Sequence, residues 1–146
     1  MTLTTADKIE LQELSSQIYI CLDSKDAPGF ASFFADDGAF VAPYGDFVGP
    51  EAVKDFIAKH IAAGKEDSVR HFLSNHLVEA HDEGARHRFY IHKVNVAVGP
   101  VAIATAGGDC LVKRTKDGWR FKRFELSIDP AMFGDDKPLV GPVSKN

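Results

Sequence analysis

A histidine and an aspartate that lie far apart in the sequence are the residues best suited to chemistry. His71 lies in the stretch Val69–Ala80, where alternation predicts a β-strand with His71 and Asn75 on one face. A buried imidazole and a buried carboxamide each need a hydrogen-bond partner. Asp23, at the end of a predicted first helix, is the best carboxylate available for His71. We therefore expect an Asp23–His71 pair inside an apolar pocket.

Such a pair has the properties of a general base. A neutral imidazole accepts a proton near neutral pH, and an aspartate on its other nitrogen fixes the tautomer and stabilises the imidazolium. The alternative is a structural histidine beside an aspartate that binds backbone groups. Tyr19, four residues before Asp23, shares its helix face and could donate to a developing oxyanion or be an ordinary core residue. Asn75 could hold a substrate oxygen, brace His71 or bind nearby backbone.

Other side chains are candidates for the same pocket. Beside Asn75, the residues expected to contact a ligand are Leu73, Tyr44, Phe33 and Trp119. Further polar candidates are Tyr90, Asn95 and either His87 or His92, since the sequence leaves open which face of their strand points inward. Arg123 could bind an anionic group, although a surface salt bridge is the commoner role of an arginine.

The elements that position these residues follow from periodicity and turn signals. The sequence predicts helices over Thr5–Ser24, with a capping box from Thr4 and Asp7, and over Asp26–Phe34 and Pro50–Gly64. Short strands are predicted at Ala39–Pro43 and after the turn Tyr44–Phe47. Long strands are predicted over Val69–Ala80, Ala85–Val98, Val101–Lys116 and Trp119–Asp129. This order predicts an α+β fold in which a meander curls around the helices. The last strand reads as apolar on both faces, with Trp119 and Phe121 against Phe124, Leu126 and Ile128. The outer sheet face is therefore expected to form a homodimer interface.

Composition excludes several classes of protein. The 146 residues suit one domain (1–130) with a tail (131–146), and the 45% hydrophobic and 26% charged fractions are those of an ordinary globular protein. A net charge of −4 argues against nucleic acid as a partner, and no apolar run or signal suggests a membrane, so a cytoplasmic location is expected. Cys21 and Cys110 lack metal-ligand spacing and are expected to be small buried hydrophobes.

Metal and cofactor sites are not expected either. The alternation of the strand places His71 and His76 on opposite faces, and the sequence contains no metal-binding histidine motif. It also contains no glycine-rich phosphate loop and no nucleophile elbow. Cofactor-independent chemistry is the natural expectation.

Several blocks of the sequence resemble the SnoaL-like branch of the nuclear transport factor 2-like superfamily. They are IYICLDSKD, FASFFADDGAF, GPEAV, RHFLSNHLVEA and DGWRFKRF, and the resemblance runs from about Thr5 to Asp129. It implies a cone of curved sheet wrapped around helices, a cystatin-like α+β barrel, with a pocket at the open end. In the dehydrochlorinase and dehydratases of this superfamily, a histidine on the third strand works with an aspartate at the end of the first helix, and His71 and Asp23 match those positions.

The expected function is a cofactor-independent lyase or isomerase, acting on a small, largely apolar steroid, polyketide or aromatic-type molecule through His71, Asp23 and Tyr19. The alternative is a noncatalytic small-molecule-binding or scaffold protein, resembling the small subunit of ring-hydroxylating dioxygenases. Met132 and Phe133 of the tail are expected to pack over the pocket mouth.

Overall fold

The helices precede the long strands, and together they form an α+β fold. The computed structural model describes residues 2–133. The elements in chain order are α1 (Thr5–Asp23), α2 (Ala27–Ser32), β1 (Phe34–Ala42), β2 (Gly45–Val48), α3 (Pro50–Ala62), β3 (Val69–His81), β4 (Gly84–Asn95), β5 (Val101–Thr115), β6 (Gly118–Ile128) and a short 3₁₀ turn, η1 (Pro130–Phe133). The predicted fold class is confirmed.

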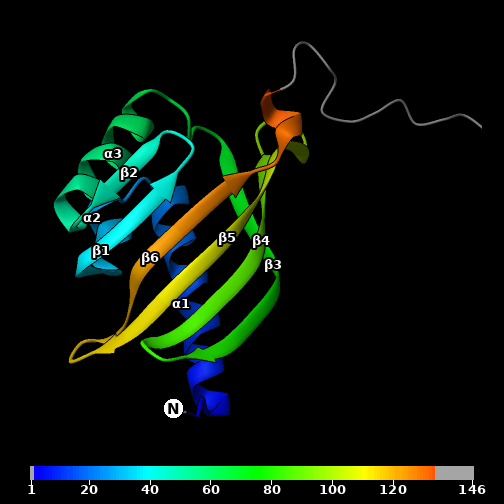
Figure 1. Ribbon diagram of the computed structural model, residues 1–146. Coiled ribbons are helices and arrows are strands. Elements are labelled where there is room, and N and C mark those ends of the chain that lie inside the picture. Colours follow the sequence, from blue (N-terminus) through cyan, green and yellow to red (C-terminus); the bar gives the residue numbers. More distant parts are fainter. Residues whose placement is uncertain (1, 134–146) are drawn as a thin grey trace, which may run out of the picture.

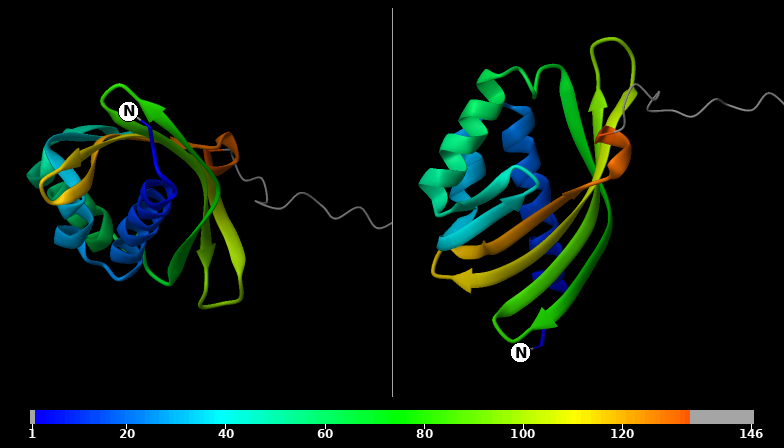
Figure 2. Two further views of the ribbon diagram at one scale, coloured as in Figure 1. Left: turned by 90° about the horizontal axis from the view of Figure 1, so that it is seen from below. Right: turned by 45° about the horizontal axis from the view of Figure 1, so that its top comes forward.

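One six-stranded sheet runs in the order β2-β1-β6-β5-β4-β3. Strands β1 and β6 pair in parallel, and the other neighbouring pairs are antiparallel. The sheet curves around α1, and α3 lies beside β1 and β2 at one end (Figure 1, Figure 2). Strands β2 and β3 are its free edges, so the sheet wraps around the helices without closing into a barrel.

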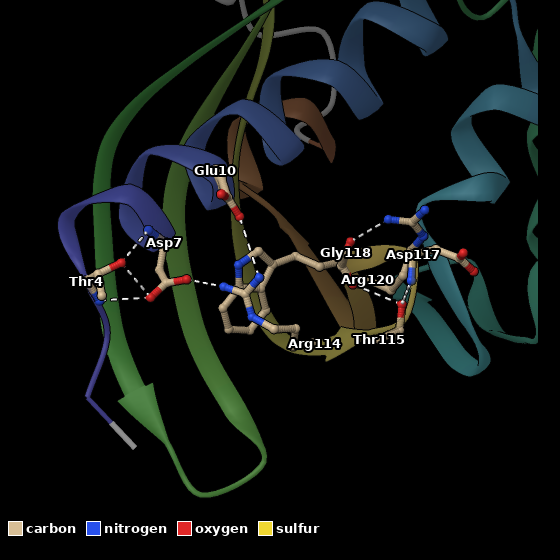
Figure 3. A network of polar contacts seen from close by, with 9 residues as sticks. Thr4, Asp7, Glu10, Arg114, Thr115, Asp117, Gly118 and Arg120 are labelled. Atoms are coloured by element: carbon tan, nitrogen blue, oxygen red, sulfur yellow. Dashed lines mark hydrogen bonds and ion pairs between the residues drawn. The ribbon is translucent and has the colours of Figure 1, made fainter.

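The N-terminus of α1 is held to the sheet near the turn between β5 and β6. Thr4 and Asp7 form the predicted capping box, in which the Asp7 backbone N–H donates to Thr4 Oγ1 at 3.1 Å and the Thr4 N–H donates to Asp7 Oδ2 at 2.8 Å. Asp7 also pairs with Arg114 of the β5–β6 hairpin (Figure 3). The Arg114 guanidinium lies 4.4 Å from the centre of the Trp119 ring, a cation–π contact. These contacts fix the direction of α1 across the sheet.

The second helix is shorter than predicted, and the strand after it begins earlier. The expected helix Asp26–Phe34 is α2, with Asp26 as its N-cap, and β1 already starts at Phe34. The Phe121 N–H donates to the carbonyl of Phe33 at 2.8 Å, so pairing with β6 ends the helix. The register of β1 against β6 then shifts between Phe34 and Ala39.

A bulge in β6 corrects the prediction that this strand is apolar on both faces. Phe121 pairs with Val112 and Arg123 pairs with Leu111, so β6 has one extra residue at this point. The extra residue reverses the alternation. The side chains on the inner face are therefore Trp119, Phe121, Phe124, Leu126 and Ile128, while Arg123 and Glu125 are exposed. The two-sided apolar pattern from which a dimer interface was predicted is therefore absent from this strand.

The core lies between α1 and the concave face of the sheet, and it is rich in aromatic rings. Phe124 contacts the rings of Tyr19, Phe40, Phe89 and Phe121, with centroids 5.2–6.3 Å apart. Cys110 is fully buried, whereas Cys21 is half-buried, and both are free thiols. In the part of the chain that the structure describes, no helix is long and apolar enough to cross a membrane. The predicted cover of the pocket by Met132 and Phe133 lies outside the described side chains, as does the chain from residue 134 onward.

Candidate active site

The end of α1 and the start of β3 bring Asp23 and His71 together. Asp23 Oδ1 lies 2.6 Å from His71 Nδ1, and Asp23 Oδ2 accepts the backbone N–H of His71 at 3.1 Å. Because a carboxylate only accepts hydrogen bonds, Nδ1 carries the proton in neutral His71. The Nε2 lone pair is therefore left for another partner. Both side chains are largely buried, with 6% of His71 and 20% of Asp23 exposed.

His71 borders an apolar cavity of about 470 Å³. The apolar lining residues are Leu22, Phe30, Phe40, Phe56, Ile57, Ile91, Ala104, Ala106, Leu126 and Ile128. The polar lining residues are Tyr19, Tyr44, His60, Lys65, Glu66, His71 and Lys93. A cavity of this size and character, with a few convergent polar groups, is typical of a small-molecule site.

Tyr19 lies beside the imidazole. Its ring centroid is 4.9 Å from that of His71, at an angle of 39°. Burial, and then the negative charges that Cys110, Glu66 and Asp23 can carry, raise the pKa of Tyr19 well above its ordinary value. The phenol therefore keeps its proton and is a hydrogen-bond donor in a cavity that it helps to line.

Glu66 is a further polar group of the cavity, and the sequence did not predict it. It lies in the turn between α3 and β3 and is only 2% exposed. Its Oε1 is 2.9 Å from Lys93 Nζ and 2.8 Å from His60 Nε2. Burial acts to raise the pKa of Glu66, but the hydrogen bonds from His60 and Lys93 and the nearby charges of Lys93 and His71 together outweigh it, and the pKa is lowered. Glu66 is therefore a buried carboxylate.

One signal could have indicated an acid at this place. Lys93 lies on the inner face of β4 as the cross-strand neighbour of His71. A lysine that faces the interior needs an anionic partner, because burial of an unpaired charge is costly. The turn residues that contain Glu66 are charged and read as solvent-exposed, so the sequence alone hides the partner.

A bulge in β3 separates Asn75 from His71. The register shifts between Ser74 and Leu77, and Asn75 has a positive φ of 56°. Asn75 is exposed and lines a shallow groove on the outer face with Tyr90 and Ser127. The prediction that Asn75 shares a face with His71 is thus wrong, because one extra residue reverses the alternation.

The same bulge turns His76 inward, so the prediction that His71 and His76 occupy opposite faces is also wrong. His76 Nδ1 lies 3.0 Å from Nε2 of His87, which is fully buried. This pair is not part of the cavity lining. Within residues 2–133, no cluster of three or more His, Cys, Asp or Glu side chains is arranged to hold a metal ion.

The remaining candidates occupy varied places. Tyr44 lines the cavity and packs on Phe56 with ring centroids 6.1 Å apart, whereas Leu73, Phe33 and Trp119 are not among the lining residues. Tyr90 and His92 point outward, which resolves the choice between His87 and His92 for the inward face. Asn95 Oδ1 accepts the N–H groups of Ala97 and Val98, and Arg123 pairs with Glu125 at 2.9 Å.

Comparison with known proteins agrees with this architecture. A similar solved structure is a protein of unknown function with a cystatin-like fold from Nostoc punctiforme, at 24% identity and a TM-score of 0.80, over 89% of this chain and 96% of that one. Others are a putative aromatic ring hydroxylase from Novosphingobium aromaticivorans (20% identity, TM-score 0.73, 87% and 92% coverage) and ActVI-ORFA from Streptomyces coelicolor (16%, 0.74, 83% and 96%). No curated protein matches the sequence.

These likenesses show the fold alone, and a match to a family model goes further. The model of the SnoaL-like domain matches residues 4–125, which span α1 to β6 and include Asp23, His71 and Glu66. The chain therefore belongs to the SnoaL-like family.

Proposed function

We propose that this protein is a cofactor-independent lyase or isomerase that removes a proton from a small, largely apolar molecule, such as a steroid, a polyketide or an aromatic-type compound. The observation that carries the proposal is the 2.6 Å contact between His71 Nδ1 and Asp23 Oδ1 at the wall of an apolar cavity. A buried dyad that only stabilised the fold would not require a cavity next to its free nitrogen.

In the proposed reaction, His71 Nε2 takes a proton from a carbon next to a carbonyl group. The electrons of the broken C–H bond form an enolate, and Asp23 stabilises the imidazolium. Tyr19 donates a hydrogen bond to the developing oxyanion, which is most effective in a cavity that excludes water. For an isomerase the proton returns to another carbon. For a dehydratase the imidazolium gives it to a leaving hydroxyl group, which departs as water.

The test begins with a ligand. Steroid and polyketide libraries are screened by thermal shift, and the molecules that stabilise the protein are followed for turnover. His71→Gln should then reduce turnover by about 10²–10⁴-fold, because glutamine fills similar space but is no base at neutral pH. Asp23→Asn should lose less, since it keeps the shape and removes the charge. His92→Gln, at an exposed position on β4, is the matched control.

The same experiment distinguishes the second candidate, a noncatalytic small-molecule-binding protein. Full turnover in both dyad variants would refute the catalytic role of His71. Ligand binding without turnover in the parent protein would favour the noncatalytic function, for which the cavity alone suffices. Circular dichroism of each variant shows whether a loss of turnover comes instead from a loss of the fold.

A further inference from the structure

Glu66 has one carboxylate oxygen that is buried without a partner. Oε1 accepts hydrogen bonds from Lys93 and His60. Oε2 is inaccessible to solvent and has no hydrogen-bond partner among the described residues. Oε2 lies 3.8 Å from His71 Nε2, and both residues line the cavity. An unpaired buried acceptor is costly, so a group that satisfies Oε2 is expected at this place.

The two facing atoms are both acceptors. Lys93 and His60 hold Glu66 as a carboxylate, and Asp23 accepts the hydrogen bond of Nδ1–H in neutral His71, which leaves a lone pair on Nε2. At 3.8 Å the two atoms are too far apart for a direct hydrogen bond, which needs about 2.7–3.2 Å. An oxygen about 2.8 Å from each atom, with an angle of roughly 85° between the two contacts, would be within hydrogen-bond distance of both. The geometry therefore favours a bridging oxygen that carries hydrogen.

We propose that Glu66 Oε2 and His71 Nε2 flank a binding site for one oxygen, which in the free protein belongs to a water molecule that donates to both atoms and in the complex belongs to a hydroxyl group of the ligand that donates to Glu66 Oε2. The second half rests on the proposed function, because it assigns a place in the same cavity to one group of the substrate. Glu66 is then the residue that selects alcohols among the apolar molecules that fit the cavity.

The side chain of Lys93 indicates a second polar group on the ligand. Two of its three N–H donors are directed to Glu66 Oε1 at 2.9 Å and to the carbonyl of Lys65 at 2.7 Å. One donor is left, and Lys93 lines the cavity on the same side as Glu66. A carbonyl oxygen of the ligand is the natural acceptor for it. The preferred ligand class is thus a hydroxy-carbonyl compound on an apolar frame.

This arrangement also suits a leaving hydroxyl group. The hydroxyl donates its hydrogen to Glu66 Oε2, so its oxygen lone pairs are available to Nε2. That contact becomes favourable only after His71 has taken the proton from carbon, because Nε2–H can then donate to the oxygen. When the C–O bond breaks, its electrons stay on this oxygen, which takes the proton from Nε2 and departs as water. An interaction that strengthens as the reaction proceeds raises the rate of the chemical step.

The first test uses the free protein. A high-resolution crystal structure near neutral pH should contain a water within about 3.2 Å of both Glu66 Oε2 and His71 Nε2, and ¹⁵N NMR of the imidazole should find an unprotonated Nε2. A direct contact between a protonated Nε2 and Glu66, with no bridging oxygen, would overturn the proposal. Neither readout involves turnover, so this result is independent of the catalytic test.

The second test uses two probes, indanone and its β-hydroxy derivative, whose affinities are compared by calorimetry. In the parent protein the hydroxyl group should increase affinity about tenfold or more, as expected for a hydrogen bond to a charged group. Glu66→Gln should lose most of this gain while indanone binds as before. Glu79→Gln, at an exposed glutamate of β3 that pairs with Arg88, should keep the gain in full.

Three outcomes count against the idea. The same hydroxyl gain in the parent and in Glu66→Gln would remove Glu66 from the site. No gain in the parent protein would refute the preference for alcohols. No binding of either probe would refute the ligand half of the proposal together with the proposed function of the cavity as a ligand site. Should Glu66→Gln fail to fold because Lys93 is left unpaired, Glu66→Gln combined with Lys93→Met removes both charges, and the ratio between the probes still reports on Glu66.

Discussion

Mild acid should destabilise this protein through the histidine pair on the inner face of β3 and β4. His87 is fully buried, its Nε2 is 3.0 Å from His76 Nδ1, and its own Nδ1 has no partner in the described part of the chain. Burial, and then the charge of His76, lower the pKa of His87 to about 4. Burial lowers the pKa of His76 as well. The folded protein therefore resists protonation at this pair.

The size of the effect follows from the shift. The unfolded chain binds the proton near the ordinary pKa of 6.5, and the folded chain binds it near 4. The stabilisation is complete above the unfolded value and is lost as the pH falls toward the folded value. At about 1.4 kcal/mol per unit, the shift corresponds to a loss of about 3 kcal/mol. This is a large part of the stability of a typical domain, about 5–15 kcal/mol.

The assay is urea unfolding followed by circular dichroism at a series of pH values. His87→Leu removes the titrating group and the unpaired Nδ1. Between about pH 6.5 and pH 4, the free energy of unfolding of the variant should therefore decrease by about 3 kcal/mol less than that of the parent. His92→Gln, on the exposed face of the same strand, should follow the parent. Parallel curves for the parent and His87→Leu would refute the reasoning. Asp37, whose pKa is lowered to about 2 by hydrogen bonds from Lys113 and Lys122, titrates below the window.

Two further predictions concern the cavity and the outer face. Ala106→Trp places a large side chain in the cavity that Ala106 lines, so the variant should keep its circular dichroism spectrum but lose the thermal stabilisation by any ligand found in the screen. Retained stabilisation would mean that the ligand binds elsewhere. We also expect a homodimer through the outer face, where Phe72 and Tyr90 are 56% and 60% exposed. Phe72→Glu with Tyr90→Lys should sediment as a monomer, and a parent protein that is already monomeric at micromolar concentration would contradict this.

Regular periodicity made most of the fold predictable. The 3.6-residue repeat of Ile18, Leu22 and their neighbours, and the alternation of the long strands between turns, gave elements whose ends agree with the structure to within a few residues. Bulges were not predictable in the same way. One extra residue near Asn75 and one near Lys122 reverse the faces of β3 and β6 beyond those points. No local sequence signal marks either residue, because pairing with the neighbouring strand decides where the extra residue goes.

The candidate site was also predictable only in part. Asp23 and His71 lie at the end of a strongly periodic helix and at the start of a strand, before its bulge, so their meeting could be predicted. Glu66 could not, because it lies in a turn whose charged residues read as solvent-exposed. Its burial depends on Lys93 and His60, which come from β4 and α3. A contact that needs three separate elements to be placed first is visible only in the folded chain.

The two carboxylates around His71 face different nitrogens of its ring. Asp23 Oδ1 accepts the hydrogen bond of Nδ1–H and orients the imidazole, whereas Glu66 Oε2 faces Nε2 at 3.8 Å. Lys93 balances the charge of Glu66 through its 2.9 Å contact with Oε1, and it is the cross-strand neighbour of His71 in the β3–β4 pair. The proposed role of His71 as a base therefore depends on Asp23, Glu66 and Lys93 as well. Changes at Glu66 and Lys93 should be strongly non-additive, because each residue determines what the other does to His71.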